Sequence, residues 1–209
     1  MITLKLLDTE EQIEKKINKA LAREFNKILR KKEKFLLGRL KRSVESWVRA
    51  SPEIQSLDDR QAYGLGAEFG IRKSKAGPAI EAIINAIVDS TVISANKFTE
   101  DLKGSIYFYF QPADFVNLLQ LQEGHVVTQK GSDLHWLDWL LTKGDQMIIQ
   151  GYEYQPSRDG RSGGGTMEKG VSFRVNPKYS GIESDNFVTR LFDKKESEIT
   201  NLIAGIFNG

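Results

Sequence analysis

The residues from Ser157 to Met167, SRDGRSGGGTM, combine four glycines with two arginines, a composition that can surround a phosphate. A P-loop requires Gly-Lys-Ser/Thr at its end and a helix directly after it, so that backbone N–H groups face the phosphates. Here Thr-Met follows Gly165, and the next run, GVSFRV, is typical of a strand. The pattern therefore favours a mobile hairpin loop with basic tips at Arg158 and Arg161 over a phosphate site.

The chain contains two histidines, His125 in EGHVV and His135 in LHWLDWLL. His135 and Asp138 lie three residues apart, a spacing that would suit an acid/base pair or two metal ligands on one helix face. A metal site needs a third and usually a fourth ligand, and no HxxE or HxH motif supplies them. We expect no metal and no cofactor, and we expect the neighbouring apolar residues to pack this helix on a sheet: Trp136, Leu137, Leu140 and Leu141.

Other residue types that support catalysis are scattered. The aspartates Asp58, Asp59, Asp133 and Asp138 show no spacing that suggests paired carboxylates. The serines Ser43, Ser46 and Ser105 lack a nucleophile-elbow context, and the chain has no cysteine. We therefore predict no catalytic residues and a protein that is not an enzyme.

Charge is distributed unevenly along the chain. Residues 1–50 contain fourteen Lys and Arg against seven Asp and Glu, whereas the net charge of the whole chain is +2. A basic face at Arg30, Lys31, Lys32 and Lys34, together with the aromatic run YFYF before Gln111, supports sequence-independent nucleic-acid binding as an alternative function. Alternating aromatic residues usually pack a core, and a basic helix face is commonly only solvated.

The first part of the chain predicts helices. Thr9 and Gln12 form a capping-box pattern, and apolar residues then recur every three or four positions as far as Trp47. An unbroken helix to Ala50 would measure roughly 60 Å, longer than a domain of this size is wide, so we expect a division at Arg30–Lys34 or Gly38. Further helices are predicted at 56–71 and at 77–98, the second with Pro78 in its first turn and a β-branched tail.

The second half predicts strands and short helices. GSIYFYFQ, QMIIQGYEYQ and GVSFRVNP read as strands, HWLDWLLTKGD as a short helix ended by Gly144, and 184–207 as an amphipathic helix capped at Ser184 or Asp185. This order predicts an α+β fold: long N-terminal helices, an antiparallel β-sheet with a short inserted helix and a long-looped hairpin, and a C-terminal amphipathic helix. We expect a basic helical segment at 1–50 and one domain at 51–209.

Three segments together resemble a known family. They are SPEIQSL…AYGLGAEFGI at 51–71, LDWLLTKGDQMIIQGYEY…RSGGGTM at 137–167, and FRVNPKYSGIESDNFVTRLF at 173–192. Their ordered combination resembles small virion proteins of tailed bacteriophages, of the neck, head–tail connector and tail-completion or tail-terminator kind. The resemblance covers residues 51–192, leaves out the N-terminal helix, and departs from the family pattern at Asn176, which separates Val175 from Pro177.

The resemblance implies a structural subunit of a homo-oligomeric ring, a hexamer or a dodecamer, that joins the portal or its adaptor to tail proteins. Genomic DNA would pass through this ring without sequence-specific binding. Inter-subunit or partner contacts are expected at Arg158, Arg161, Gly163, Gly164 and Gly165. The expected location is the virion, with the host cytoplasm during assembly, in agreement with the lack of cysteine, of a signal-peptide core and of any run of ~20 apolar residues.

Overall fold

The computed structural model describes residues 8–58, 64–110, 115–127, 131–156, 160 and 165–207. The fold is α+β, as predicted, with a long N-terminal helix and small antiparallel sheets. The chain divides into two compact units, one from Met1–Leu40, Thr91–Tyr109 and Ser197–Gly209 and the other from Lys41–Ser90 and Phe110–Glu196. This division differs from the boundary expected at residue 50, because the first unit draws on three separate stretches of the chain.

Helix α1 (Glu10–Ala50) is one continuous helix of 41 residues. The expected division at Arg30–Lys34 or Gly38 is wrong. The predicted capping box is present: the backbone N–H of Thr9 donates to Gln12 Oε1 at 3.0 Å, and that of Gln12 donates to Thr9 Oγ1 at 3.3 Å. A single glycine costs a helix only about 1 kcal/mol. Leu36 and Leu40, which flank Gly38, are fully buried and more than compensate for that cost.

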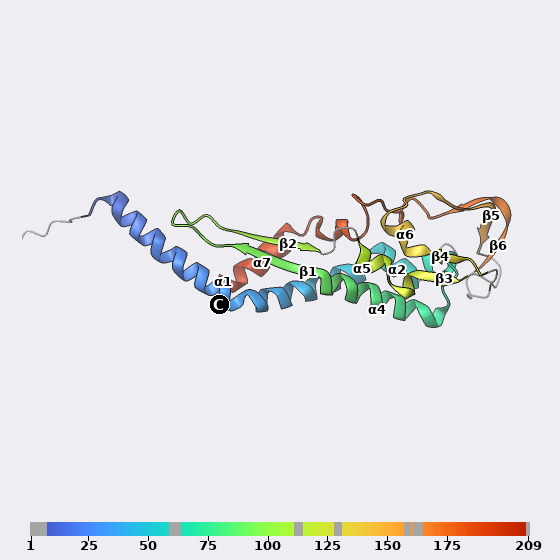
Figure 1. Cartoon of the computed structure of the whole chain (residues 1–209), viewed down its shortest axis with the longest axis horizontal. Coiled ribbons are helices and arrows are strands. Elements are labelled where there is room, and N and C mark those ends of the chain that lie inside the picture. Colours follow the sequence, from blue (N-terminus) through green and yellow to red (C-terminus); the bar gives the residue numbers. More distant parts are fainter. Residues whose placement is uncertain are drawn as a thin grey trace, which may run out of the picture. The chain divides into compact units, whose positions relative to one another are not determined.

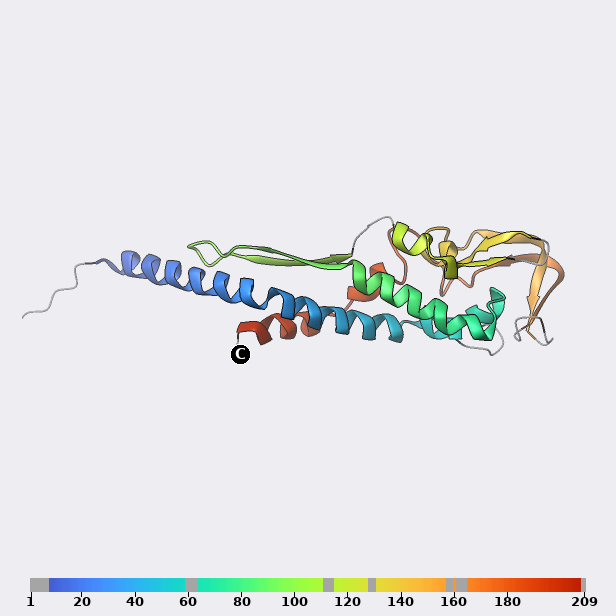
Figure 2. The same ribbon diagram turned by 60° about the horizontal axis from the view of Figure 1, so that its bottom comes forward.

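The first unit has three layers: two helices and a β-hairpin. Strands β1 (Thr91–Asn96) and β2 (Ser105–Phe110) form a two-stranded sheet that lies beside α7 (Glu196–Phe207) and the N-terminal part of α1 (Figures 1 and 2). Its core is one apolar cluster in which all three layers contact one another: Leu29, Leu36, Ile93, Ala95, Phe98, Ile106, Phe108, Leu202, Ile206 and Phe207.

Polar contacts also hold this hairpin to α1. The side-chain amide of Asn26 donates to the carbonyl of Phe98 at 2.9 Å and accepts from the N–H of Phe98 at 2.8 Å. On β2, Ile106 and Phe108 join the core while Tyr107 and Tyr109 are exposed. The predicted alternation of this strand is confirmed, and the rings exposed on the outer face are tyrosines.

Helix α4 (Lys73–Ser90) begins earlier than predicted. The carbonyl of Arg72 accepts the N–H groups of Lys75 and Ala76 at 2.8 and 3.2 Å, which starts the helix five residues before Pro78. Pro78 therefore lies inside the helix instead of in its first turn. The β-branched tail, which we predicted as helix or strand, is strand β1, since β-branched residues fit a pleated surface better than a helix.

The three segments that carry the family resemblance all belong to the second unit and contact one another there. Helices α2 (Pro52–Asp58) and α3 (Leu65–Glu68) come from the first segment. The buried carboxylate of Glu53 in α2 lies 3.6 Å from the guanidinium of Arg190 in the third segment. The ring of Phe69, which follows α3, lies 5.5 Å from that of Trp136, the residue directly before the second segment, at the start of α6 (Trp136–Leu141).

Gly181 and Asn186 join the third segment to the end of α6. Gly181 donates its N–H to the carbonyl of Trp139 at 3.1 Å and accepts from the N–H of Gly144 at 2.8 Å. A Cβ at Gly181 would collide with the carbonyl of Leu140, so no larger residue fits there. Gly144 has φ +63°, in agreement with the predicted end of the helix. We call the contacts of Glu53–Arg190, Gly144–Gly181 and Asn186 the motif framework.

The C-terminal helix begins later than predicted. Residues 184–185 form no cap for it; instead Asn186 Oδ1 accepts the N–H groups of Val188 and Thr189, and a short 3-10 turn, η2 (Thr189–Phe192), follows. Lys194 then has φ +60°, which ends the turn, and α7 starts at Glu196. The apolar spacing before and after this break is typical of a single helix. For that reason the sequence pattern predicted one helix across it.

The described strands form three two-stranded sheets instead of the single sheet we expected. Besides β1–β2 these are β3 (His125–Val127) with β4 (Asp133–His135), and β5 (Met147–Gln155) with β6 (Thr166–Arg174). Both of the latter pairs are antiparallel. An isolated two-stranded sheet is marginally stable in water and needs a helix to pack on. Helix α6 follows β4 and contacts β3, and α5 (Val116–Leu119) precedes β3 in the chain.

Within the described ranges, none of the helices combines the length and the apolar character that crossing a bilayer requires.

Replacing Asn186 with Ala tests the motif framework. Asn186 is fully buried, donates to the carbonyls of Leu141 and Ile182 at 3.1 and 2.9 Å, and accepts two backbone N–H groups. The change leaves these groups unpaired in the interior, so we expect the free energy of unfolding to fall by about 3 kcal/mol in urea titrations. The control Asn201→Ala, on an exposed position of α7, should change it by less than about 0.5 kcal/mol. An equal loss of stability in Asn186→Ala and Asn201→Ala would contradict the role of Asn186 in the motif framework.

Glu68 provides a pH test. Burial raises the pKa of the Glu68 carboxyl from its ordinary value of 4.5 to about 7. Because the unfolded chain releases this proton first, the stability contributed by neutral Glu68 is complete below pH 4.5 and is lost as the pH rises to about 7. The free energy of unfolding of Glu68→Gln, measured by urea unfolding, should equal that of the parent at pH 4 and exceed it by about 2 kcal/mol at pH 8. Glu183→Gln, at an exposed carboxyl, is the control and should show no such pH dependence.

Candidate functional site

The β3–β4 hairpin brings together the two histidines of the chain and one aspartate. His125 pairs directly with His135 across the two strands, and Asp133 lies on the same face of β4, two residues before His135. Asp133 Oδ2 lies 3.0 Å from His125 Nδ1 and 3.3 Å from His135 Nε2. The imidazole ring centroids are 3.7 Å apart at an interplanar angle of 47°. We call this group the His–Asp–His cluster.

The backbone on both sides of the cluster is firmly held. Trp136, the residue after His135, is fully buried and donates its indole N–H to the carbonyl of Glu123 at 3.1 Å. Glu123 lies two residues before His125, in the 3-10 turn η1 (Gln122–Gly124). Gly124 packs so closely on Leu137 that an added Cβ would come within 3.2 Å of its Cβ. One buried tryptophan therefore fixes both strands at the end where the histidines lie.

The cluster is open to solvent on one side. The side chains of His125, Asp133 and His135 are 25%, 46% and 53% exposed. The hydrogen bond from His125 lowers the pKa of the Asp133 carboxyl, and the nearby His135 lowers it further. An ionised carboxylate beside two imidazole nitrogens can share protons with them or bind a cation with them.

The pairing of His135 with Asp138, against which the lack of further ligands argued, does not occur. Asp138 lies on α6 and accepts a hydrogen bond from the hydroxyl of Thr142, and its carboxylate lies 3.7 Å from Lys143 Nζ. His135 is instead the last residue of β4, so the spacing of three does not fall within one helix. The helix starts one residue later, and this shift sends the imidazole towards Asp133.

Sequence reasoning missed the His–Asp–His cluster because it searched for HxH and HxxE patterns. The signal was Asp-Leu-His at 133–135, a spacing of two that places both polar side chains on one face of a strand. The third member, His125, becomes a neighbour only through the strand register. A search for D-x-H beside a hairpin would have found two of the three residues.

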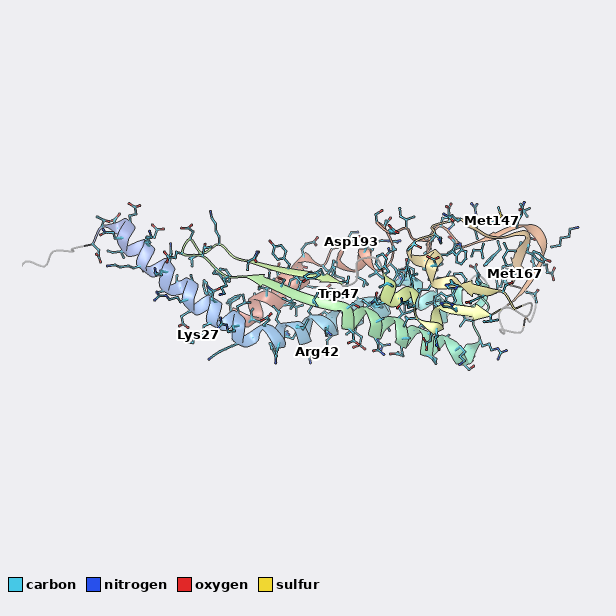
Figure 3. All side chains as sticks on the ribbon, in the orientation of Figure 1. Lys27, Arg42, Trp47, Met147, Met167 and Asp193 are labelled. Carbon is cyan, nitrogen blue, oxygen red and sulfur yellow. The ribbon has the colours of Figure 1, made fainter. Side chains whose placement is uncertain are left out.

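The β5–β6 hairpin presents apolar side chains to solvent. Val171, Met147 and Tyr152 are 83%, 53% and 42% exposed, and Met147 and Met167 are labelled on the two strands in Figure 3. At the base of the hairpin, the side chains of Phe173 and Val175 are buried. Among the described residues, β5 and β6 pair only with each other, with register shifts between Met147 and Ile149 and between Gln150 and Tyr152.

Of the five expected contact residues, Gly165 is the one among the described residues. Arg158, Arg161, Gly163 and Gly164 lie outside the described residues. Gly165 directly precedes β6, and a Cβ there would come within 2.6 Å of both the carbonyl of Gln155 and the ring of Tyr154. A strand and not a helix follows the glycine-rich stretch, which agrees with the argument against a phosphate loop.

The expected basic face on α1 is spread around the helix. Arg30, Lys31 and Lys34 are exposed, whereas Lys32 is half-buried. Successive residues of a helix are separated by about 100°, so only Arg30 and Lys34 project in nearly the same direction. No ion pair in the described part of the chain involves these four residues. They form a basic band around the helix and not a single face.

Comparisons with protein-family models, with curated proteins and with solved structures found no match to this chain.

Replacing Gly165 with Ala tests how closely the chain must approach itself at the start of β6. The new methyl group collides with the backbone of Gln155, so we expect the free energy of unfolding to fall by about 1–3 kcal/mol, measured by thermal and urea unfolding. Gly38→Ala is the matched control: its Cβ meets nothing within 4 Å inside α1 and should stabilise the chain by about 0.5–1 kcal/mol. Stabilisation by both changes would contradict the close approach.

Proposed function

We propose that this protein is a structural subunit of a tailed-phage neck, of the head–tail connector, tail-completion or tail-terminator kind, and that it forms a homo-oligomeric ring. In this role it contacts the portal or its adaptor on one side and tail proteins on the other. It performs no reaction of its own. The proposal starts from the three sequence segments that resemble such proteins.

The motif framework supports the proposal. Segments that are separated by tens of residues meet through Glu53 and Arg190 and through Gly144 and Gly181. The resemblance therefore concerns residues that hold one unit together, as expected if a common fold underlies the common motifs. Buried polar contacts of this kind maintain a fold and do not by themselves carry out chemistry.

The observation that carries the proposal is the exposed apolar surface of the β5–β6 hairpin, which extends from the same framework. Val171 leaves most of its side chain in water, and Met147 and Tyr152 add to the same strand pair. Exposed apolar side chains on a two-stranded hairpin, whose edges are unpaired among the described residues, are suited to cover by another chain. A contact between this hairpin and a different surface of the next copy is head-to-tail, and such contacts close into rings when the rotation between copies permits.

In the proposed function, genomic DNA passes through the ring. The basic band of α1 carries Arg30, Lys31 and Lys34 in exposed positions, where they can meet DNA phosphates without reading sequence. The same band underlies the alternative function, a nucleic-acid-binding protein that does not assemble. The ring and the monomeric DNA-binding protein differ in mass and in how strongly salt weakens their DNA binding.

Light scattering coupled to size-exclusion chromatography distinguishes these functions. We expect the untagged chain at micromolar concentration to form one discrete species of about six or twelve subunits, and its DNA binding to be weak. A strict monomer whose DNA binding weakens steeply with salt would support the alternative and overturn the ring.

A single substitution then tests the surface itself. Val171→Lys places a charge on the most exposed apolar residue, so the monomer should keep its circular dichroism spectrum and melting temperature while the oligomer dissociates. Val127→Lys, at a 63% exposed position on β3, is the matched control and should assemble normally. Normal assembly of Val171→Lys would rule out the hairpin as the contact surface.

A further inference from the structure

The His–Asp–His cluster has the donor set of a transition-metal site. Ligand atoms of His125, Asp133 and His135 all lie within 4.8 Å of one another, on one face of a single hairpin. Two imidazole nitrogens and one carboxylate oxygen suit zinc and its neighbours in the periodic table. Magnesium and calcium prefer sites built from oxygen alone.

The distances fit tetrahedral coordination. Zinc binds nitrogen and carboxylate oxygen at about 2.0–2.2 Å, so two ligands of a tetrahedral site lie about 3.3 Å apart. The separations from Asp133 Oδ2 to His125 Nδ1 and His135 Nε2 are 3.0 and 3.3 Å. These separations agree with two edges of such a tetrahedron, and the ligand atoms of the two histidines lie within 4.8 Å of each other.

The hairpin is prepared for binding before any ion arrives. The buried indole of Trp136 holds the carbonyl of Glu123, and this contact fixes the residues beside His135 and His125. Little backbone freedom remains to be lost on binding, which favours affinity. The strands themselves are three residues each, so a bridge between them stabilises a short sheet.

We propose that His125, Asp133 and His135 bind one zinc ion, with His125 Nδ1, His135 Nε2 and a carboxylate oxygen of Asp133 as ligands and water in the fourth position. The exposed side of the cluster admits that water. The site crosslinks β3 to β4. It is independent of ring assembly, because all three ligands belong to one chain.

The proposal competes with a metal-free arrangement in which both imidazoles donate N–H groups to Asp133. The two arrangements differ in where the protons lie: zinc replaces the proton on His125 Nδ1 and on His135 Nε2, whereas the metal-free cluster keeps both. Since the chain contains only these two histidines, imidazole nitrogen resonances report on the cluster without overlap.

The test uses the untagged full chain, treated with chelator and titrated with zinc chloride at pH 7.5. We expect both histidines to shift in long-range ¹H–¹⁵N spectra, saturation at one equivalent, and a rise in melting temperature. Magnesium chloride should cause neither the histidine shifts nor the rise in melting temperature. Absence of shifts at a fivefold excess of zinc would overturn the proposal without recourse to any variant.

Variants then assign the ligands by calorimetry. Asp133→Asn and His135→Ala should each weaken zinc binding at least about tenfold, with folding checked by circular dichroism. Asp138→Asn is the matched control, since Asp138 faces Thr142 and Lys143, and should bind like the parent. Unchanged affinity in folded Asp133→Asn, or equal loss in Asp138→Asn, would contradict the assigned site.

Discussion

The second unit depends on the way its C-terminal segment is bonded to the end of α6. Asn186 satisfies two backbone carbonyls and two backbone N–H groups in a fully buried position, and Gly181 adds backbone bonds to Trp139 and Gly144. A buried polar group costs more when unpaired than it contributes when paired, so this arrangement permits very few other residues. It also fixes where α6 ends and where β5 can begin.

Both hairpins with functional interest lie next to this framework along the chain. The β3–β4 hairpin leads directly into α6 through Trp136, and the β5–β6 hairpin leaves it after Gly144. The first hairpin gathers two imidazoles and a carboxylate on a fixed backbone, whereas the second exposes apolar side chains. Segments held by a rigid scaffold are common places for functional residues.

Much of this fold could be predicted from the sequence, and the reasons are local. The Thr9 capping box, the alternation of β2 and the glycine after α6 each depend on residues close together in the chain. The errors came from longer-range effects. Burial of Leu36 and Leu40 carried α1 past Gly38, and the positive φ of Lys194 split an amphipathic pattern into a turn and a helix. The His–Asp–His cluster depended on strand register, which no spacing rule within one helix could reveal.

The central claim is that copies of this chain assemble into a ring through the β5–β6 hairpin. Electron microscopy of the purified chain tests it most directly, because class averages show symmetry without any assumption about mass. We expect closed particles with one rotational symmetry and a central opening. Particles of single-chain size at every concentration, or open filaments without closure, would contradict it.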